Sequence, residues 1–161
     1  MENDSIEVDL DDFDRRIIAA LVEDGRMTVT DLAGVVGLSK TPCQVRLRRL
    51  MELGVIKGFR AVVDPAKLGI DHIAFAEVKM SDTRDKALEE FNRAVWKIPE
   101  IEECHLIAGS FDYLLKVRTR DIRRYRAVLG EKISSLPHVA STSTFVSMET
   151  VLDEGVRRKA R

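Results

Sequence analysis

Six side chains suited to nucleic-acid contacts are concentrated at residues 40–49. Lysine and arginine bind phosphate oxygens as cations, arginine also pairs with guanine, glutamine pairs with adenine, and threonine offers a hydroxyl and a methyl group. They are Lys40, Thr41, Gln44, Arg46, Arg48 and Arg49. Residues 39–60 hold six bases and one acid, a local net charge of +5, whereas the whole chain carries a formal net charge of -1. Because a polyanion responds to local charge rather than to the sum, this pattern favours contact with double-stranded DNA.

Helical spacing predicts which of these side chains face outward. A helix capped by Ser39, with Pro42 in its first turn, would bury an apolar stripe. The residues of that stripe are Cys43, Leu47 and Leu50. The residues turned away from it are Lys40, Thr41, Gln44, Val45 and Arg48, with Arg49 near the edge. Arg46 lies close to the stripe, so both a phosphate contact and an ion pair with an acid of the preceding helix, such as Asp14, are open to it.

A second group of residues fits the recognition of a free amino acid, which presents an ammonium, a carboxylate and a side chain. Asp112 can accept hydrogen bonds from the ammonium, and Gly109 lets backbone N–H groups approach the carboxylate closely. Leu106, Ala108 and Ile122 could line an apolar pocket for the side chain. The alternative is a tight hairpin in which Gly and Asp serve only the turn geometry. Composition and spacing alone do not separate the two interpretations.

The basic segment belongs to a predicted domain of three helices. Asp11 or Asp12 begins the first helix, which ends before Gly25, and the second runs from Thr28 to Gly37. The second helix, a short turn and the basic helix form a helix-turn-helix, a motif that places its second helix in the major groove. Val55 to Val63 alternates loosely, which predicts a short strand pair and a winged form of this domain.

The residues after Gly69 show a different pattern, which predicts strands and helices in the order βαββαβ. The predicted elements are strand 70–80, helix 85–97, strand 101–107, strand 113–119, helix 121–136 and strand 139–151. Each helix has a single apolar face, so we expect a four-stranded antiparallel sheet with both helices on one side, a ferredoxin-like α+β sandwich. Its other face would be bare, and we expect a second subunit to cover it. Asp64-Pro65 and Gly69 mark the boundary between domain 1–64, with a linker to about 69, and domain 70–161.

Composition and motifs exclude several other classes of protein. The 161 residues are 45% hydrophobic and 33% charged, which suits one globular domain or two small ones and argues against disorder. No apolar run approaches roughly 18 residues and the amino terminus is acidic, so we expect a cytoplasmic protein with no membrane partner. Cys43 and Cys104 are expected to be free thiols, and His72, His105 and His138 lack companions at metal-ligand spacing. No motif of an enzyme is present, so neither catalysis nor a metal or other cofactor is expected. The basic residues 157–161 are expected to fray.

Several motifs together resemble the Lrp/AsnC family of bacterial transcription regulators, and the leucine-responsive branch in particular. They are Leu38-Ser39-Lys40-Thr41-Pro42-Cys43, Arg46, Arg48-Arg49-Leu50, Gly54-Val55-Ile56-Lys57-Gly58-Phe59, Glu103-Cys104-His105-Leu106, Gly109-Ser110-Phe111-Asp112-Tyr113-Leu114-Leu115-Lys116 and Tyr125-Arg126. The resemblance covers nearly the whole chain. It implies an amino-terminal DNA-binding domain, a carboxy-terminal domain that senses a small amino acid, homodimers through that domain and homo-octamers of four dimers.

The resemblance also bears on the effector. It implies a site at the interface between subunits, with Val146 and Ser147 as contacts from the second side and Ser110 and Tyr113 within the sensing loop. Lys40 stands where the family often has Pro, and the run Ser39–Cys43 resembles members that control proline utilisation. Ser110 stands where Asp is common. The effector therefore stays open between leucine, proline and a similar amino acid, since apolar pockets discriminate by only about 1–3 kcal/mol.

Two modes of action remain compatible with these features. The first is a sequence-specific regulator, activator or repressor, whose DNA binding responds to an amino acid. The second is an architectural protein that wraps DNA through phosphate contacts and needs little effector. A large ratio of specific to random DNA affinity would distinguish the first from the second.

Overall fold

A computed structural model describes residues 8–152 of the chain. Glu2, Asp4 and Glu7 of the acidic terminus, and the basic residues 157–161, lie outside the described residues. The chain divides into two compact units, residues 1–61 and 62–161. Among residues 8–152, none of the helices combines the length and the apolar character that a membrane span requires.

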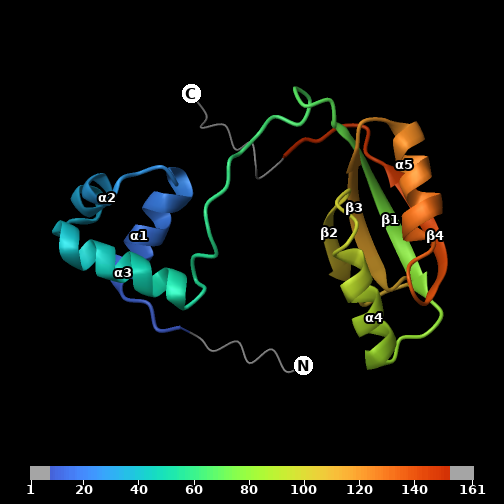
Figure 1. The fold of residues 1–161 in the computed structure, drawn as a ribbon, viewed down its shortest axis with the longest axis horizontal. Coiled ribbons are helices and arrows are strands. Elements are labelled where there is room, and N and C mark those ends of the chain that lie inside the picture. Colours follow the sequence, from blue (N-terminus) through green and yellow to red (C-terminus); the bar gives the residue numbers. More distant parts are fainter. Residues whose placement is uncertain (1–7, 153–161) are drawn as a thin grey trace. The chain divides into compact units, whose positions relative to one another are not determined.

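The first unit consists of three helices whose ends are set by local capping. They are α1 (Asp12–Glu23), α2 (Val29–Val36) and α3 (Lys40–Glu52) (Figure 1). The Asp14 N–H donates to the Asp11 carboxylate at 2.9 Å, and the Asp31 N–H donates to the Thr28 hydroxyl at 3.2 Å. Gly37 ends α2 with a positive φ of 76°, a conformation in which a glycine has no Cβ to clash. The three predicted helices and the short turn between α2 and α3 are confirmed.

A small core joins the three helices. Its fully buried side chains include Ile17 of α1, Leu32 and Val36 of α2, and Cys43 and Leu50 of α3. The predicted inner stripe of α3 is therefore correct, with Leu47 only partly buried. Both cysteines of the chain are free.

The predicted strand pair after α3 is wrong. Among the described residues, no strand lies between Glu52 and His72, and most of residues 57–71 are exposed. Gly58, with φ 149°, interrupts the extended segment, and Val62 and Val63 are 65% and 54% exposed. A strand needs a partner to bond its N–H and C=O groups, and local alternation cannot supply one. The first unit is a helix-turn-helix without the expected wing.

The second unit has the predicted βαββαβ order. It contains β1 (His72–Met80), α4 (Asp85–Val95), β2 (Ile101–Leu106), β3 (Tyr113–Thr119), α5 (Ile122–Val128), a π-helical turn (Leu129–Ile133) and β4 (Val139–Val146). The strands pair antiparallel in the order β2-β3-β1-β4 (Figure 1). The ferredoxin-like α+β prediction is confirmed.

One face of this sheet packs on the helices. Along β1 and β3 the buried side chains alternate with more exposed ones, and Phe91 of α4 stacks on Tyr113 of β3 with ring centroids 4.3 Å apart. The opposite face carries Phe75 of β1 directly across from Phe145 of β4, and Phe145 is 54% exposed. No helix or strand described in this unit covers these side chains, as the sequence pattern led us to expect.

The last strand is shorter than predicted. Val146 pairs with Ala74, and the Ser147 N–H donates to the Ile73 carbonyl at 2.9 Å. Because β1 begins at His72, which lies opposite Met148 in this register, residues beyond Met148 have no neighbouring strand to pair with. β4 therefore ends five residues before Val151, where the apolar pattern still suggested a strand.

Candidate functional site

The outer side of α3 presents the polar residues that the sequence placed there. Lys40, Thr41, Gln44 and Arg48 are exposed. None of the four makes a side-chain hydrogen bond or ion pair within residues 8–152. Their donors and acceptors are thus available to a ligand. Ser39 holds the N-cap position of α3, although its side chain makes no capping hydrogen bond.

Arg46 and Arg49 have a different environment, because both bind acids of α1. The Asp14 carboxylate is 1% exposed and accepts hydrogen bonds from Arg46 Nη1 at 2.9 Å and from Arg49 Nη1 at 3.0 Å. Arg46 Nη1 also lies 2.6 Å from the Asp11 carboxylate, and its guanidinium sits 5.4 Å from the centre of the Phe13 ring. The ion pair with Asp14 that the sequence left open for Arg46 is therefore formed.

These contacts favour the charged forms of Asp11 and Arg46. Hydrogen bonds from the Asp14 backbone N–H and from Arg46 lower the pKa of Asp11. Hydrogen bonds to Asp11 and Asp14 raise the pKa of Arg46. Two of the six bases in the segment are thus compensated locally, which concentrates the free positive charge of α3 at Lys40 and Arg48.

The loop between β2 and β3 is a tight connection centred on Asp112. The Ile107 N–H donates to the Asp112 carbonyl at 2.8 Å, and the Asp112 N–H donates to the Val78 carbonyl at 3.0 Å. The Asp112 carboxylate accepts the Met80 N–H at 2.7 Å. Asp112 therefore has a structural role, and a carboxylate has further lone pairs for an ammonium. The three other loop residues proposed for the site, Ala108, Gly109 and Ser110, are exposed.

One chain does not bring all the predicted effector residues together. Tyr113 pairs with Val78 at one end of the sheet, and Thr119 pairs with His72 at the other. β3 joins these ends over seven residues, a length of about 20 Å. Leu106, Ala108, Gly109, Ser110, Asp112 and Tyr113 lie at the first end, and Ile122, Val146 and Ser147 lie at the second. A pocket lined by both groups requires a second chain.

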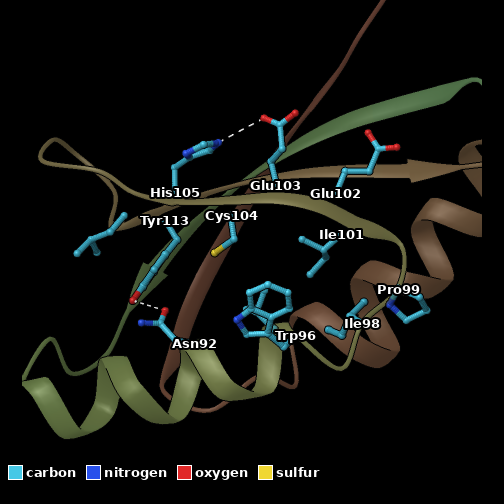
Figure 2. Close-up of a pocket in the computed structure, with 12 residues that line it drawn as sticks. Asn92, Trp96, Ile98, Pro99, Ile101, Glu102, Glu103, Cys104, His105 and Tyr113 are labelled. Carbon is cyan, nitrogen blue, oxygen red and sulfur yellow. Dashed lines mark hydrogen bonds and ion pairs between the residues drawn. The ribbon is translucent and has the colours of Figure 1, made fainter. Parts of the chain in front are cut away.

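A cavity of about 650 Å³ lies between α4 and β2 and includes two of the predicted residues, Leu106 and Tyr113. Figure 2 shows Trp96 and Cys104 facing the cavity, with the Tyr113 hydroxyl donating to Asn92 at 2.9 Å. Sequence reasoning missed Trp96, Asn92 and Cys104 as pocket residues. The signal available in the sequence was Trp96 itself, a large apolar residue outside the apolar stripe of the predicted helix 85–97. In the structure Trp96 is the C-cap of α4 and is 90% exposed.

The cavity offers little to a zwitterion. Burial raises the pKa of the Cys104 thiol to about 11, so this group is neutral at physiological pH. Glu103 and His105 bind each other at 3.3 Å on the side of β2 away from Trp96 (Figure 2). Glu102 and Glu103 also line the cavity, but both carboxylates already pair with Lys116. The remaining lining is mainly apolar with neutral polar groups.

Together, a helix-turn-helix with a polar outer helix and a ferredoxin-like unit with an uncovered sheet face define a two-domain transcription regulator. A family model described as AsnC-type helix-turn-helix domain matches residues 10–51, and one described as Lrp/AsnC ligand binding domain matches residues 73–156. The chain belongs to the Lrp/AsnC family. The resemblance found in the sequence motifs is confirmed.

Individual relatives support this assignment. The chain is 70% identical over 148 residues to the proline dehydrogenase transcriptional activator of Rhizobium radiobacter, covering 92% of this chain and 95% of that protein. It is 46% identical to the leucine-responsive regulatory protein of Escherichia coli strain K12, covering 89% and 87% respectively. A crystal structure of a transcriptional regulator from Neisseria meningitidis in complex with L-Met matches with a TM-score of 0.82 and 28% identity, covering 90% of this chain and 94% of that one.

Proposed function

We propose that this chain regulates a proline dehydrogenase gene and that proline is the amino acid to which it responds. The observation that carries the proposal is the 70% identity, over 92% of the chain, to a protein named as a proline dehydrogenase transcriptional activator. The much lower identity to a leucine-responsive protein, 46%, favours proline over leucine. If proline, the substrate of this enzyme, controls the gene, the amount of enzyme would follow the amount of proline. The protein would act in the bacterial cytosol, where the DNA lies.

In this proposal domain 1–64 binds DNA through α3. Lys40, Thr41, Gln44 and Arg48 would contact base edges and phosphates, because their side chains are exposed and have no partner within the described residues. Arg46 and Arg49 would contribute to phosphate binding from the edge of the helix, while Asp14 fixes their positions. Exposed side chains on a helix held by a rigid core suit direct readout in the major groove.

Domain 70–161 would bind the effector at an interface between two chains. This follows from the separation of the two groups of predicted residues by the length of β3. The uncovered face of the sheet, with Phe75 and Phe145 in opposing positions, supplies an apolar surface for a homodimer. Four such dimers would then assemble into an octamer.

The effector is tested by a thermal-shift screen of the purified chain against the twenty amino acids. A ligand that binds only the folded state at about 100 times its dissociation constant stabilises it by about 2.7 kcal/mol. We expect proline to raise the melting temperature more than any other amino acid. A larger shift with leucine, or none with any amino acid in the presence and absence of DNA, would contradict proline as the effector.

The role of Asp112 needs a variant that keeps the loop intact. Asp112→Asn retains an oxygen that can accept the Met80 N–H, but it removes the negative charge that an ammonium would require. We expect the variant to fold and bind DNA normally while losing most of its affinity for proline. Asp82→Asn is the matched control, because Asp82 also follows β1 closely yet pairs locally with Arg84. Equal affinities for the two variants would contradict the assignment of Asp112.

A further inference from the structure

The two helices of the second unit differ sharply in charge. Residues 120–132, which span α5 and its flanks, hold five bases and two acids. Residues 85–97, which span α4, hold three of each. A solvated helix usually mixes charges of both signs, as α4 does, so the excess on α5 calls for a physical reason.

Part of the basic group of α5 is compensated inside the unit. Arg124 Nη2 and Lys132 Nζ each lie 2.8 Å from the Glu100 carboxylate. The Asp121 carboxylate caps α5 by accepting the Arg124 N–H at 2.7 Å. These contacts account for two of the five bases and for one of the two acids.

The other three bases have no such partner. Arg120, Arg123 and Arg126 are exposed, and within residues 8–152 none of them makes a hydrogen bond from its side chain or an ion pair. Arg123 and Arg126 are three residues apart on α5, so their side chains lie on the same face of this helix. Arg120 lies two residues before α5 begins at Ile122. Two exposed arginines on one face of α5 and a third just before its N-terminus thus carry positive charge without a partner in the described residues, and we call these three residues the α5 arginine line.

We propose that the α5 arginine line is a second DNA-contact surface, which binds the phosphate backbone of a duplex outside the segment that α3 contacts. Charge complementarity favours this occupant: duplex DNA carries one negative charge per about 1.7 Å of axis, and three residues of helix advance by about 4.5 Å. Guanidinium groups bind phosphate oxygens bidentately without reading sequence. The inference rests on the proposed function, because it assumes that α3 first brings DNA to the protein.

The test compares two variants of the full chain that lose the same charge. R120A/R123A/R126A removes the α5 arginine line, and K86A/R93A/K97A removes three bases from the region of α4. DNA affinity is measured for random-sequence duplexes of about 20 and about 150 base pairs over a range of KCl concentrations, because each phosphate contact adds about 0.9 to the slope of log K against log salt. Sedimentation velocity on each variant reports the oligomeric state.

For the long duplex, we expect the arginine variant to lose about 2 to 3 from the salt slope per engaged subunit, and at least about tenfold in affinity near physiological salt. The α4 variant should keep the slope of the unchanged protein, and the short duplex should bind all three proteins similarly. Equal salt slopes for the two variants on the long duplex would overturn the proposal. A change in the oligomeric state of the arginine variant without a change in its salt slope would also overturn it, because the α5 arginine line would then contact a neighbouring subunit. An unchanged protein that binds neither duplex would instead overturn the proposed function itself.

Discussion

Asp14 shows how one buried carboxylate organises two arginines of α3. It is 1% exposed and lies 2.9 Å from Arg46 and 3.0 Å from Arg49. Arg46 and Arg49 are 29% and 46% exposed, so solvent compensates in part for the loss of this carboxylate, and Arg46 also keeps Asp11 as a partner. Asp14→Ala also removes the acceptor of the Asp11 N–H in the capping box, so it should lower the free energy of unfolding of the first unit by about 1 to 2 kcal/mol.

Amide hydrogen exchange of α1 to α3 in the full chain measures this change locally. Asp12→Ala is the control, because Asp12 is an exposed acid in the same turn of the same helix. We expect it to change protection little. If the two variants gave the same protection, Asp14 would not organise the arginines as described.

Glu100 should make the second unit sensitive to acid. Burial raises the pKa of this carboxyl, but hydrogen bonds from Lys132 and Arg124 outweigh burial and hold the pKa below its usual value of 4.5. A lowered pKa in the folded state stabilises the fold above the unfolded pKa, and this contribution is lost as pH falls through the folded pKa. Stability should thus decrease from about pH 5 downward.

Urea unfolding at a series of pH values measures this effect. Glu100→Gln should be less stable than the unchanged chain at pH 7 and should show a weaker decrease toward pH 3. Glu149→Gln, at an exposed site described without an ion pair, should follow the unchanged chain. A parallel pH dependence for Glu100→Gln would contradict the assigned role of Glu100.

At the scale of elements, the sequence predicted well what local chemistry determines. α1 and α2 begin at their predicted caps, and α2 ends at Gly37, because capping involves residues only a few positions apart. The order of elements in the second unit also followed from pattern alone. Two failures involve distant partners: the strand pair after α3 that does not form, and the early end of β4. The predicted helix 121–136 is also wrong in part, because α5 ends at Val128 and a π-helical turn follows it to Ile133.

Gly34 within α2 and Gly37 at its C-cap together test whether local residues set the end of this helix. Gly34 lies within the helix and a Cβ added there would meet nothing within 4 Å, whereas Gly37 has φ 76°. Gly34→Ala should stabilise the chain by up to about 1 kcal/mol, because alanine favours helix. Gly37→Ala should destabilise it by about 1 kcal/mol, because the left-handed conformation strains any Cβ. Thermal unfolding measures both, and the same sign for the two variants would contradict the cap assignment.

At the scale of the whole molecule, the uncovered sheet face should be the dimer interface. Phe145, 54% exposed opposite Phe75, lies at its apolar part. Phe145→Asp would place a charge in that interface, so we expect a monomer in sedimentation equilibrium where the unchanged chain forms a dimer or a larger assembly. Trp96→Asp is the control, since Trp96 is 90% exposed but belongs to the helical side of the unit. Dissociation by Trp96→Asp and not by Phe145→Asp would place the interface elsewhere.

The central claim is that DNA binding through α3 responds to proline, and one equilibrium measurement tests it directly. The full chain first selects a duplex from a random-sequence library, and fluorescence anisotropy then gives the affinity for that duplex with and without proline or leucine. We expect proline to change the affinity of the unchanged chain, and Arg48→Ala to weaken binding by about 10- to 100-fold, since a bidentate base contact is worth about 1–3 kcal/mol. Arg15→Ala, an exposed arginine of α1, should bind like the unchanged chain. Selection of no preferred sequence, equal affinities for Arg48→Ala and Arg15→Ala, or an affinity that no amino acid alters would contradict the account.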